Sequence, residues 1–302
     1  MEINLFNFEK RVFSQFYQDG ILEKIFELIG VTNKYFVEFG SNGTDTGLGN
    51  SAYLRKALGF DGLLMDGTEN PEAIYDLKNE FISAENINEL LEKYKVPRVF
   101  DFLSIDIDGE DFWVAGSVDL EKFKPRVVSI EFNPDIPPPR AIIQIHQQDW
   151  VWSGDDRYGC SITAAKDLLN HMGYTLVAAS GVDAIFIADE EIEKNNLQFK
   201  YANDEHKIFS KATQHLSSPA DLTPHTIIAE ADNQDEAREL IRGFLKAFEC
   251  DEQESTTKEI LKYNWYVEAI DGKLEHSYFL DQTINRDSNK KIEPKEGSIF
   301  LE

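Results

Sequence analysis

Acidic side chains at two places in the chain have the types and spacing of a divalent-cation site. In the segment SIDIDGED, Asp106 and Asp108 alternate along one side of an apolar run as it ends, and in EFN, Glu131 and Asn133 do the same. Two neighbouring parallel strands joined by one helix would bring these ends close together. Oxygen ligands without histidine or thiolate suit Mg²⁺, Mn²⁺ or Ca²⁺. The spacing therefore predicts a metal site at these four side chains.

Such a cation would lower the pKa of a bound hydroxyl and orient its oxygen for attack. The alternative is a general base, for which His146 in the segment IHQQDWVWSGDD is the best single candidate. A lone histidine in such a loop is more often a solvated surface residue, and this structural alternative stays open for His146. Asp106 and His146 are therefore the candidate catalytic residues. A purely structural alternative also stands for the acid pair: one acid contacts a cofactor, and the other caps a helix that begins near Glu110.

The segment YFVEFGSNGTDTGLGNS is the second stretch with chemical information, because an apolar run ends in Glu38 and glycines follow closely. A P-loop needs Lys and then Ser or Thr after its last glycine, and a dinucleotide-binding turn needs GxGxxG; the segment has neither pattern. A nucleoside cofactor without phosphates is left, because the carboxylate of Glu38 repels pyrophosphate but attracts a cationic amino or sulfonium group.

A second acid, Asp66, ends the next apolar run in GLLMDG. A carboxylate at that place can accept hydrogen bonds from two ribose hydroxyls. Each acid taken alone is explained equally well as a cap for a loop. At successive strand ends, Glu38 and Asp66 together favour S-adenosylmethionine as the cofactor.

Alternating strands and helices must position these residues. The pattern predicts strands at 34–39, 62–65, 81–83, 99–106 and 125–132, with helices at 50–58, 70–78, 86–94 and 110–118 between them. The helix at 50–58 has Asn50 or Ser51 as its cap, and the helix at 70–78 has Asn70 followed by Pro71. This alternation predicts a doubly wound parallel sheet with helices on both faces.

The alternation breaks at NPDIPPP, because proline fixes φ and removes backbone donors. The irregular stretch that follows, up to Gly159, carries Trp150 and Trp152 beside several aspartates. This composition favours a binding loop for a sugar or a cationic acceptor; tryptophans that only pack the loop are the alternative. A helix is predicted at 161–173, and strands at 175–180 and 183–188 form a tight hairpin, which predicts an antiparallel strand at the sheet edge.

Residues 191–302 are charged and lack the strand–helix alternation. Within them we predict an amphipathic helix at 235–248 and a hairpin at 265–280 that turns at Asp271-Gly272. The chain is therefore predicted to contain an α/β domain over residues 1–190 and an acidic α+β appendage over residues 191–302.

Six segments in chain order resemble one family of proteins: FSQFYQDGIL, YFVEFGSNG, NSAYLRKALGFDGLLMDG, ENINELLEKY, FDFLSIDIDGEDFWV and VVSIEFNP. Their order is similar to that of the FkbM-like methyltransferases and, more broadly, of the class I S-adenosylmethionine-dependent methyltransferases. The resemblance extends from about Ser14 to Ala188. It implies a Rossmann-like, doubly wound α/β sheet of seven strands, one of them antiparallel.

The resemblance also implies a set of cofactor contacts. They come from the loop after the first strand, the end of the second strand, a turn near the adenine, and the acid of SIDIDGED: Glu38, Gly40, Ser41, Asn42, Gly43, Asp66, Glu85, Asn86 and Asp106. Gln15 and Asp19 match a helix motif that often precedes the first strand in the family and closes over the cofactor. The predicted metal ligands look similar to those of catechol-type O-methyltransferases, which use acids and an amide to bind Mg²⁺.

Two other functions stay open. SIDIDGED also resembles the nucleophile motif of haloacid-dehalogenase-type phosphatases, in which the first Asp attacks phosphorus and the second protonates the leaving group. That motif normally opens its domain, whereas three strand–helix units precede it here. The fold can also serve as a binding or assembly module without catalysis, although an intact pair of Glu38 and Asp66 argues against this. A calcium-binding loop is excluded because its glycine comes too early.

The composition limits the partners. The formal charge of −25 argues against nucleic acid and anionic membrane surfaces, since both require a protein to neutralise phosphate. The two cysteines form no disulfide framework, and the N-terminus lacks the cationic start and apolar stretch of a signal peptide, so we expect a cytoplasmic protein. The expected partner is a small-molecule acceptor, a sugar or natural product; a homo-oligomer is compatible with the sequence.

Overall fold

The computed structural model describes residues 2–41, 43, 49–68, 70–144, 146, 151–152 and 158–216, and the backbone of residues 264–270 and 273–279. Its elements in chain order are η1 (Leu5–Phe8), α1 (Gln18–Ile29), β1 (Tyr35–Phe39), α2 (Ala52–Leu58), β2 (Asp61–Asp66), β3 (Leu77–Asn79), α3 (Ile87–Lys93), β4 (Val99–Ile105), α4 (Asp111–Ser117), β5 (Lys124–Glu131), β6 (Ile143–Gln144), α5 (Ile162–His171), β7 (Tyr174–Ser180), β8 (Asp183–Ala188), α6 (Asp189–Lys194), α7 (Glu205–Ala212), η2 (Thr213–His215), β9 (Asn264–Ile270) and β10 (Lys273–Phe279).

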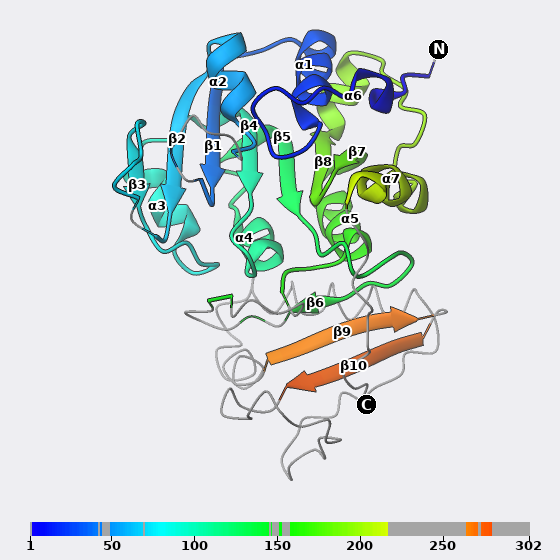
Figure 1. Cartoon of the computed structure of the whole chain (residues 1–302). Helices are drawn as coiled ribbons and strands as arrows, with labels where there is room; N and C mark the ends of the chain where they lie inside the picture. The colour runs from blue at the N-terminus through cyan, green and yellow to red at the C-terminus, as the bar shows by residue number, and fades with distance from the viewer. Residues whose placement is uncertain are drawn as a thin grey trace.

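Seven strands form one sheet in the order β3-β2-β1-β4-β5-β8-β7 (Figure 1). The pairs β2–β3, β1–β2, β1–β4 and β4–β5 are parallel, and β8 is antiparallel to both of its neighbours. The predicted sheet of seven strands with one antiparallel strand is therefore confirmed. The predicted place of that strand is wrong, because β8 lies between β5 and β7, and β7 forms the edge.

The predicted strand at 81–83 and helix at 70–78 are also wrong. The third strand is Leu77–Asn79, which pairs with β2. A turn does begin at Asn70, whose backbone oxygen accepts from the amide of Ala73 at 3.1 Å. The next amide, that of Ile74, donates instead to the carbonyl of Gly43 at 2.9 Å, so this tertiary bond ends the turn before a helix can form.

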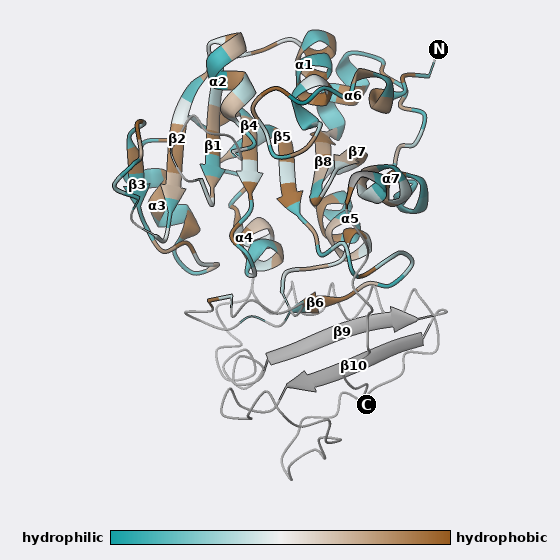
Figure 2. Cartoon of the chain, viewed as in Figure 1, coloured by the Kyte–Doolittle hydropathy of each residue, from teal (hydrophilic) through white to brown (hydrophobic). Residues whose placement is uncertain are grey.

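Two apolar cores lie on opposite faces of the sheet. One contains Phe36, Leu64 and Phe102 with side chains of α1 and α2, and the other contains Val37 and Phe39 with side chains of α3, α4, α5 and α7. Adjacent residues of β1 thus face opposite cores, which explains why every residue of this strand except Glu38 is apolar or aromatic. Figure 2 shows hydrophobic residues along much of the strands and on the helices that cover them.

Three strands form a second, smaller sheet in the order β10-β9-β6. The predicted hairpin at 265–280 is confirmed as the antiparallel pair β9–β10, and β6 pairs with β9; in Figure 1 these strands lie beyond the carboxyl ends of β1, β4 and β5. The turn residues 271–272 and the predicted helix at 235–248 lie outside the described residues. The domain division at residue 190 stays a prediction; α7 packs against β7 of the main sheet.

No helix in the described part of the chain is both long enough and apolar enough to span a bilayer.

Candidate functional site

The site lies at the carboxyl ends of β1, β2, β4 and β5. The strand order of the sheet places β2 and β3 on one side of β1 and β4 and β5 on the other. The carboxyl ends of β1 and β4 are therefore the topological switch point, where ligands of open α/β sheets bind. Gly40 follows β1 with φ +77°, and a Cβ there would lie 1.5 Å from the backbone oxygen of Asp106. Only glycine allows the turn after β1 to approach the end of β4 this closely.

Glu38 is buried beneath this turn, with 2% of its surface exposed. Its carboxylate accepts from the backbone amide of Asn50 at 2.6 Å, and from the amide and the hydroxyl of Ser51. Burial raises the pKa of Glu38, while these bonds and the charge of Arg55 oppose the rise. Glu38 therefore holds the start of α2 against β1, and its predicted direct contact with a cationic cofactor group stays a prediction.

A buried polar network continues from Asn50 behind β1. The Asn50 side chain donates to Asp183 at 2.7 Å and to the hydroxyl of Ser104 at 3.0 Å. Gln18 donates to Asn50 at 2.6 Å and to Asp183 at 3.1 Å. Burial raises the pKa of Asp183 to about 7. The network ties the first turn of α1, the start of α2, β4 and β8 together at the carboxyl edge.

Asp66 ends β2 and is partly exposed beside the same edge. One of its carboxylate oxygens accepts from the backbone amide of Thr68 at 2.6 Å. Burial and the neighbouring charge of Asp108 raise its pKa. The side chain is therefore placed at the edge with one carboxylate oxygen bound within its own turn, and its predicted ribose contact stays a prediction.

Three of the four predicted metal ligands come together at the ends of β4 and β5. Asp106, Asp108 and Glu131 each offer a carboxylate oxygen, and these oxygens lie within 4.8 Å of one another. Glu131 is 7% exposed, and its Oε2 is buried with no hydrogen-bond partner among the described residues. Burial raises the pKa of Asp106 and of Glu131 well above the ordinary range, and every charged group that adds to either rise is another carboxylate.

The turn that carries Asp106 and Asp108 is fixed by the fully buried Asp111. Its two oxygens accept from the backbone amides of Ile107 and Gly109, both at 2.8 Å. Asp108 itself has φ +58°, a left-handed conformation that aspartate tolerates better than most residues. Since Asp111 is also the first residue of α4, the helix and the acid cluster have a common support.

Asn133, the fourth predicted metal ligand, is fully buried. Its side chain donates to the backbone oxygen of Tyr158 at 3.2 Å and accepts from the amide of Asp135 at 3.0 Å. Both hydrogen bonds hold the segment after β5 in place, so the side-chain amide of Asn133 stabilises the fold. Its role as a metal ligand stays a prediction.

His146 lies in a buried ion-pair cluster and is 1% exposed. Its Nδ1 pairs with the carboxylate of Glu110, and its Nε2 pairs with that of Glu85. Burial lowers the pKa of His146, but these two carboxylates outweigh that effect and raise it to about 9. The ring is therefore protonated at neutral pH and has no lone pair with which to accept a proton. The base role predicted for His146 stays a prediction, and this arrangement favours a different one.

The remaining predicted cofactor residues have mostly structural partners. Asn86 accepts from the amide of Ser83 at 2.9 Å and donates to the oxygen of Phe81 at 2.7 Å. Asp19 is buried and accepts from the amides of Val12, Phe13 and Ser14. Gln15 is exposed next to that segment, and Glu85 faces His146.

The loop after β1 contains the other predicted contacts. Ser41 is buried, and its hydroxyl accepts from the amide of Gly43 at 3.3 Å. Asn42 lies outside the described residues, as does Trp150 of the proposed acceptor loop. Trp152 is 45% exposed, and its ring centroid lies 5.8 Å from that of Tyr158.

Sequence reasoning missed several residues of this edge: Gln18, Asp183, Glu110, Asp111 and Tyr158. Asp111 had a partial signal, because acids are enriched in the first turn of a helix, although its bonds to the preceding turn were not predictable. Asp183 and Gln18 had none, since they are 165 positions apart and meet only in the fold.

Two comparisons with known proteins bear on this geometry. A comparison with curated proteins finds no match. Residues 66–158 match the family model described as the methyltransferase FkbM domain, a range that begins at Asp66 and includes β3, β4, β5 and the acid cluster. The match, together with the seven-stranded sheet and its carboxyl-edge site, supports an FkbM-like methyltransferase domain in this chain.

Proposed function

We propose that the protein uses S-adenosylmethionine to methylate a hydroxyl group of a sugar or small natural product in the cytoplasm, with help from a divalent cation. One observation carries the proposal. Glu38, Asp66 and Asp106 lie at the carboxyl ends of three adjacent parallel strands: Glu38 is next to last in β1, Asp66 ends β2 and Asp106 follows β4. The turn after β1 contacts the end of β4 without space for a side chain. A switch point with acids at three strand ends suits a cationic nucleoside better than a phosphate.

S-adenosylmethionine would supply an electrophilic methyl group for direct displacement by the acceptor oxygen. The residues of the chain then act mainly by positioning. Asp66 is proposed to bind the ribose hydroxyls through the carboxylate oxygen that does not accept from Thr68. Glu38, held by Asn50 and Ser51, is proposed to give the crevice a negative potential that favours a sulfonium or ammonium group.

The acid cluster fits a divalent cation. Asp106, Asp108 and Glu131 offer three oxygens within 4.8 Å of one another, and an oxygen-only set suits Mg²⁺ or Mn²⁺. Within the described part of the chain, the buried Oε2 of Glu131 has no hydrogen-bond partner, which is costly unless a ligand satisfies it. A bound cation would lower the pKa of the acceptor hydroxyl.

The acceptor proton needs a destination in this scheme. His146 is protonated at neutral pH, because its pKa is raised to about 9. Burial and neighbouring carboxylates raise the pKa values of Asp106 and Glu131, so these two carboxylates are the candidate acceptors of this proton. Trp152 and Tyr158 support an acceptor that contains a ring, because their side chains form a partly exposed aromatic pair in the segment between β6 and α5.

Calorimetric titration with S-adenosylmethionine, with and without Mg²⁺ after chelation, tests the proposal. Asp66→Ala should abolish micromolar-range binding. Asp61→Ala, at the exposed opposite end of the same strand, is the matched control and should bind as the wild type does. Asp106→Asn should remove the effect of Mg²⁺. Wild-type protein that binds no S-adenosylmethionine in either condition would refute the function, and cofactor binding unaffected by Mg²⁺ would refute the metal alone.

A further inference from the structure

We infer that His146 is a positioning residue whose ring clamps the Glu85 turn, the start of α4 and the segment after β6 into one unit beside the acid cluster. The clamp itself stands on the geometry below. Its consequence for ligand binding rests on the proposed function.

Three separate segments meet at the His146 ring. Glu110, the residue before α4, pairs with Nδ1, and Glu85, in the turn before α3, pairs with Nε2. The ring centroid also lies 5.9 Å from that of Trp113 in α4. His146 lies two residues after the end of β6, so the ring joins the β6 segment to the beginnings of two helices.

The β6 segment is itself fixed on its other sides, which makes His146 a rigid attachment point. The indole of Trp113 donates to the backbone oxygen of Gln144 at 2.6 Å. The amide of Gln144 donates to the oxygen of Gly159 at 2.8 Å, and the side-chain oxygen of Gln144 accepts from the amide of Gly159 at 3.1 Å. A histidine held on such a base can transmit its position to whatever its ring binds.

Charge explains why a histidine stands between these two acids. Glu110 has a side chain 5% exposed, and Glu85 is 42% exposed. Without the positive ring, a buried carboxylate would have a like charge nearby and would lose its ion-pair partner, which is strongly unfavourable. The imidazolium supplies two N–H donors in opposite directions, which is the geometry needed to join carboxylates on either side.

The clamp reaches the acid cluster through Glu110. The next residue, Asp111, holds the amides of Ile107 and Gly109, and these flank Asp108. A shift of Glu110 would therefore move the turn on which Asp106 and Asp108 stand. His146 is thus expected to set the geometry of the cation and cofactor site without touching either ligand.

The first test asks whether the bridge exists in solution. In a pH titration of the imidazole resonances, the signal that is missing from His146→Gln should titrate at about 9 in the wild type. The titration should move down by about one unit or more in Glu110→Gln, because a carboxylate partner is lost. A wild-type His146 that titrates at its ordinary value, about 6.5, would overturn the inference.

The second test asks whether the bridge holds the acid turn. His146→Gln should speed amide hydrogen exchange in a peptide that covers residues 106–111, relative to both the wild type and His206→Gln. His206 is the matched control because it is an exposed histidine on α7. Unchanged exchange in this peptide would overturn the clamp, whether or not the protein is a methyltransferase.

The third test addresses the ligands. Residues that hold metal ligands in place typically change metal affinity by roughly 10–100-fold when replaced, so His146→Gln should weaken Mg²⁺ binding by about tenfold or more. His206→Gln should leave it unchanged. Equal Mg²⁺ and S-adenosylmethionine affinities in His146→Gln and wild type would refute the positioning role. If wild-type protein binds neither ligand, the proposed function fails, and the exchange test alone decides the clamp.

Discussion

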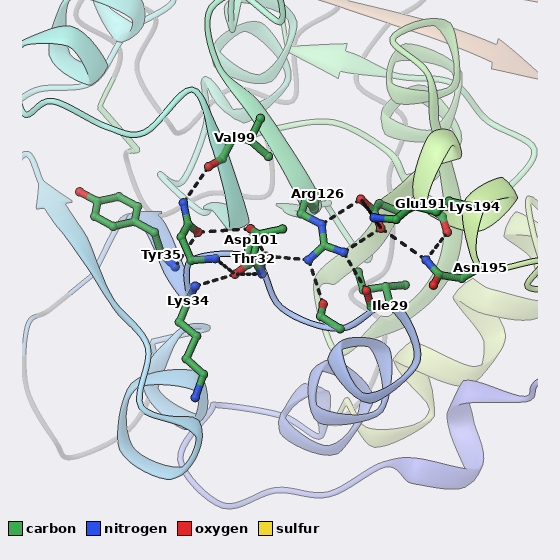
Figure 3. A network of polar contacts seen from close by, with 12 residues as sticks. Ile29, Thr32, Lys34, Tyr35, Val99, Asp101, Arg126, Glu191, Lys194 and Asn195 are labelled. Carbon is green, nitrogen blue, oxygen red and sulfur yellow. Dashed lines mark hydrogen bonds and ion pairs between the residues drawn. The ribbon is translucent and has the colours of Figure 1, made fainter.

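Arg126 offers the most demanding test of the fold, because it connects four elements at the amino edge of the sheet (Figure 3). Its guanidinium pairs with both oxygens of Glu191 in α6, at 3.0 and 2.7 Å, and with Asp101 of β4 at 2.7 Å. It also donates to the backbone oxygens of Ile29 and Gly30 at the end of α1. Its side chain is 3% exposed, and those of Asp101 and Glu191 are 0% and 8% exposed, so both ion pairs lie away from water.

Replacement by methionine keeps most of the volume and removes every one of these bonds. Asp101 would still accept from the backbone amides of Thr32, Asn33 and Lys34. Glu191 would lose its bidentate partner, and the two carbonyls of α1 would lose their donors. Removing one member of a buried pair costs about 3–5 kcal/mol, and because Asp101 stays satisfied we expect Arg126→Met to fall at the lower end, about 3 kcal/mol.

Urea unfolding followed by circular dichroism measures this loss. Lys122→Met is the matched control, since it breaks an exposed pair with Glu92 and should cost less than about 1 kcal/mol. The double variant Arg126→Met with Glu191→Met should regain part of the loss, because both charges are then gone. If Arg126→Met costs no more than Lys122→Met, or if the double variant is less stable than the sum of the single changes, the reasoning is refuted.

Three further perturbations follow from the carboxyl edge. The pKa of His146 is about 9 in the folded protein and about 6.5 in the unfolded chain. The clamp should therefore add about 3 kcal/mol to the free energy of unfolding below pH 6.5, and this contribution should be lost as the pH rises through 9. Urea unfolding of wild type and His146→Gln at pH 6 and pH 9.5 measures the change. Gly40→Ala should abolish binding of S-adenosylmethionine and lower the melting temperature far more than Gly59→Ala, which has a similar positive φ but no atom near its Cβ; equal effects would mean that only backbone strain matters. The pKa of Asp183 is raised to about 7, so the free energy of unfolding of the wild type should fall as the pH rises from 4 to 7. Asp183→Asn should lose this pH dependence. If the pH dependence is unchanged in Asp183→Asn, other groups cause it.

Much of the α/β unit was predictable because its determinants are local. Each of the strands β1, β2, β4 and β5 is a short apolar run bounded by polar residues, and period and length suffice to find it. The acids Asp106, Asp108 and Glu131 were predictable as a cluster for a related reason. Parallel strands end at one edge, so residues just beyond neighbouring strands must lie near one another.

The failures arise where distant residues compete with local preference. The helix predicted at 70–78 does not form because Gly43 takes the amide of Ile74, a contact that no local window contains. The charge state of His146 could not be predicted, because Glu85 and Glu110 are 61 and 36 positions away in the chain. A histidine in an irregular stretch is equally compatible with a base, a surface residue or a clamp until its neighbours are known.

Buried acids at the two edges of the sheet differ in whether they have a basic partner, and this difference can be tested. At the amino edge, Arg126 balances Asp101 and Glu191. At the carboxyl edge, the described lysines and arginines form no ion pair with Asp106, Asp108 or Glu131, and the charged neighbours that raise the pKa of Asp106 and Glu131 are all acids. Buried charge without a counter-charge lowers stability unless a cation binds. A ligand present at a hundred times its Kd adds about 2.7 kcal/mol to the free energy of unfolding.

Asp106→Asn should therefore melt at a higher temperature than the wild type at pH 8 without ligand. Its melting temperature should also rise less than that of the wild type when Mg²⁺ and S-adenosylmethionine are added. The carboxylates that bind the cation are the same ones that destabilise the free protein. An Asp106→Asn variant that melts at a lower temperature than the wild type would show that the acid cluster is not a source of strain in the free protein. The carboxyl edge would then have to be explained by packing and hydrogen bonds instead of by a missing cation.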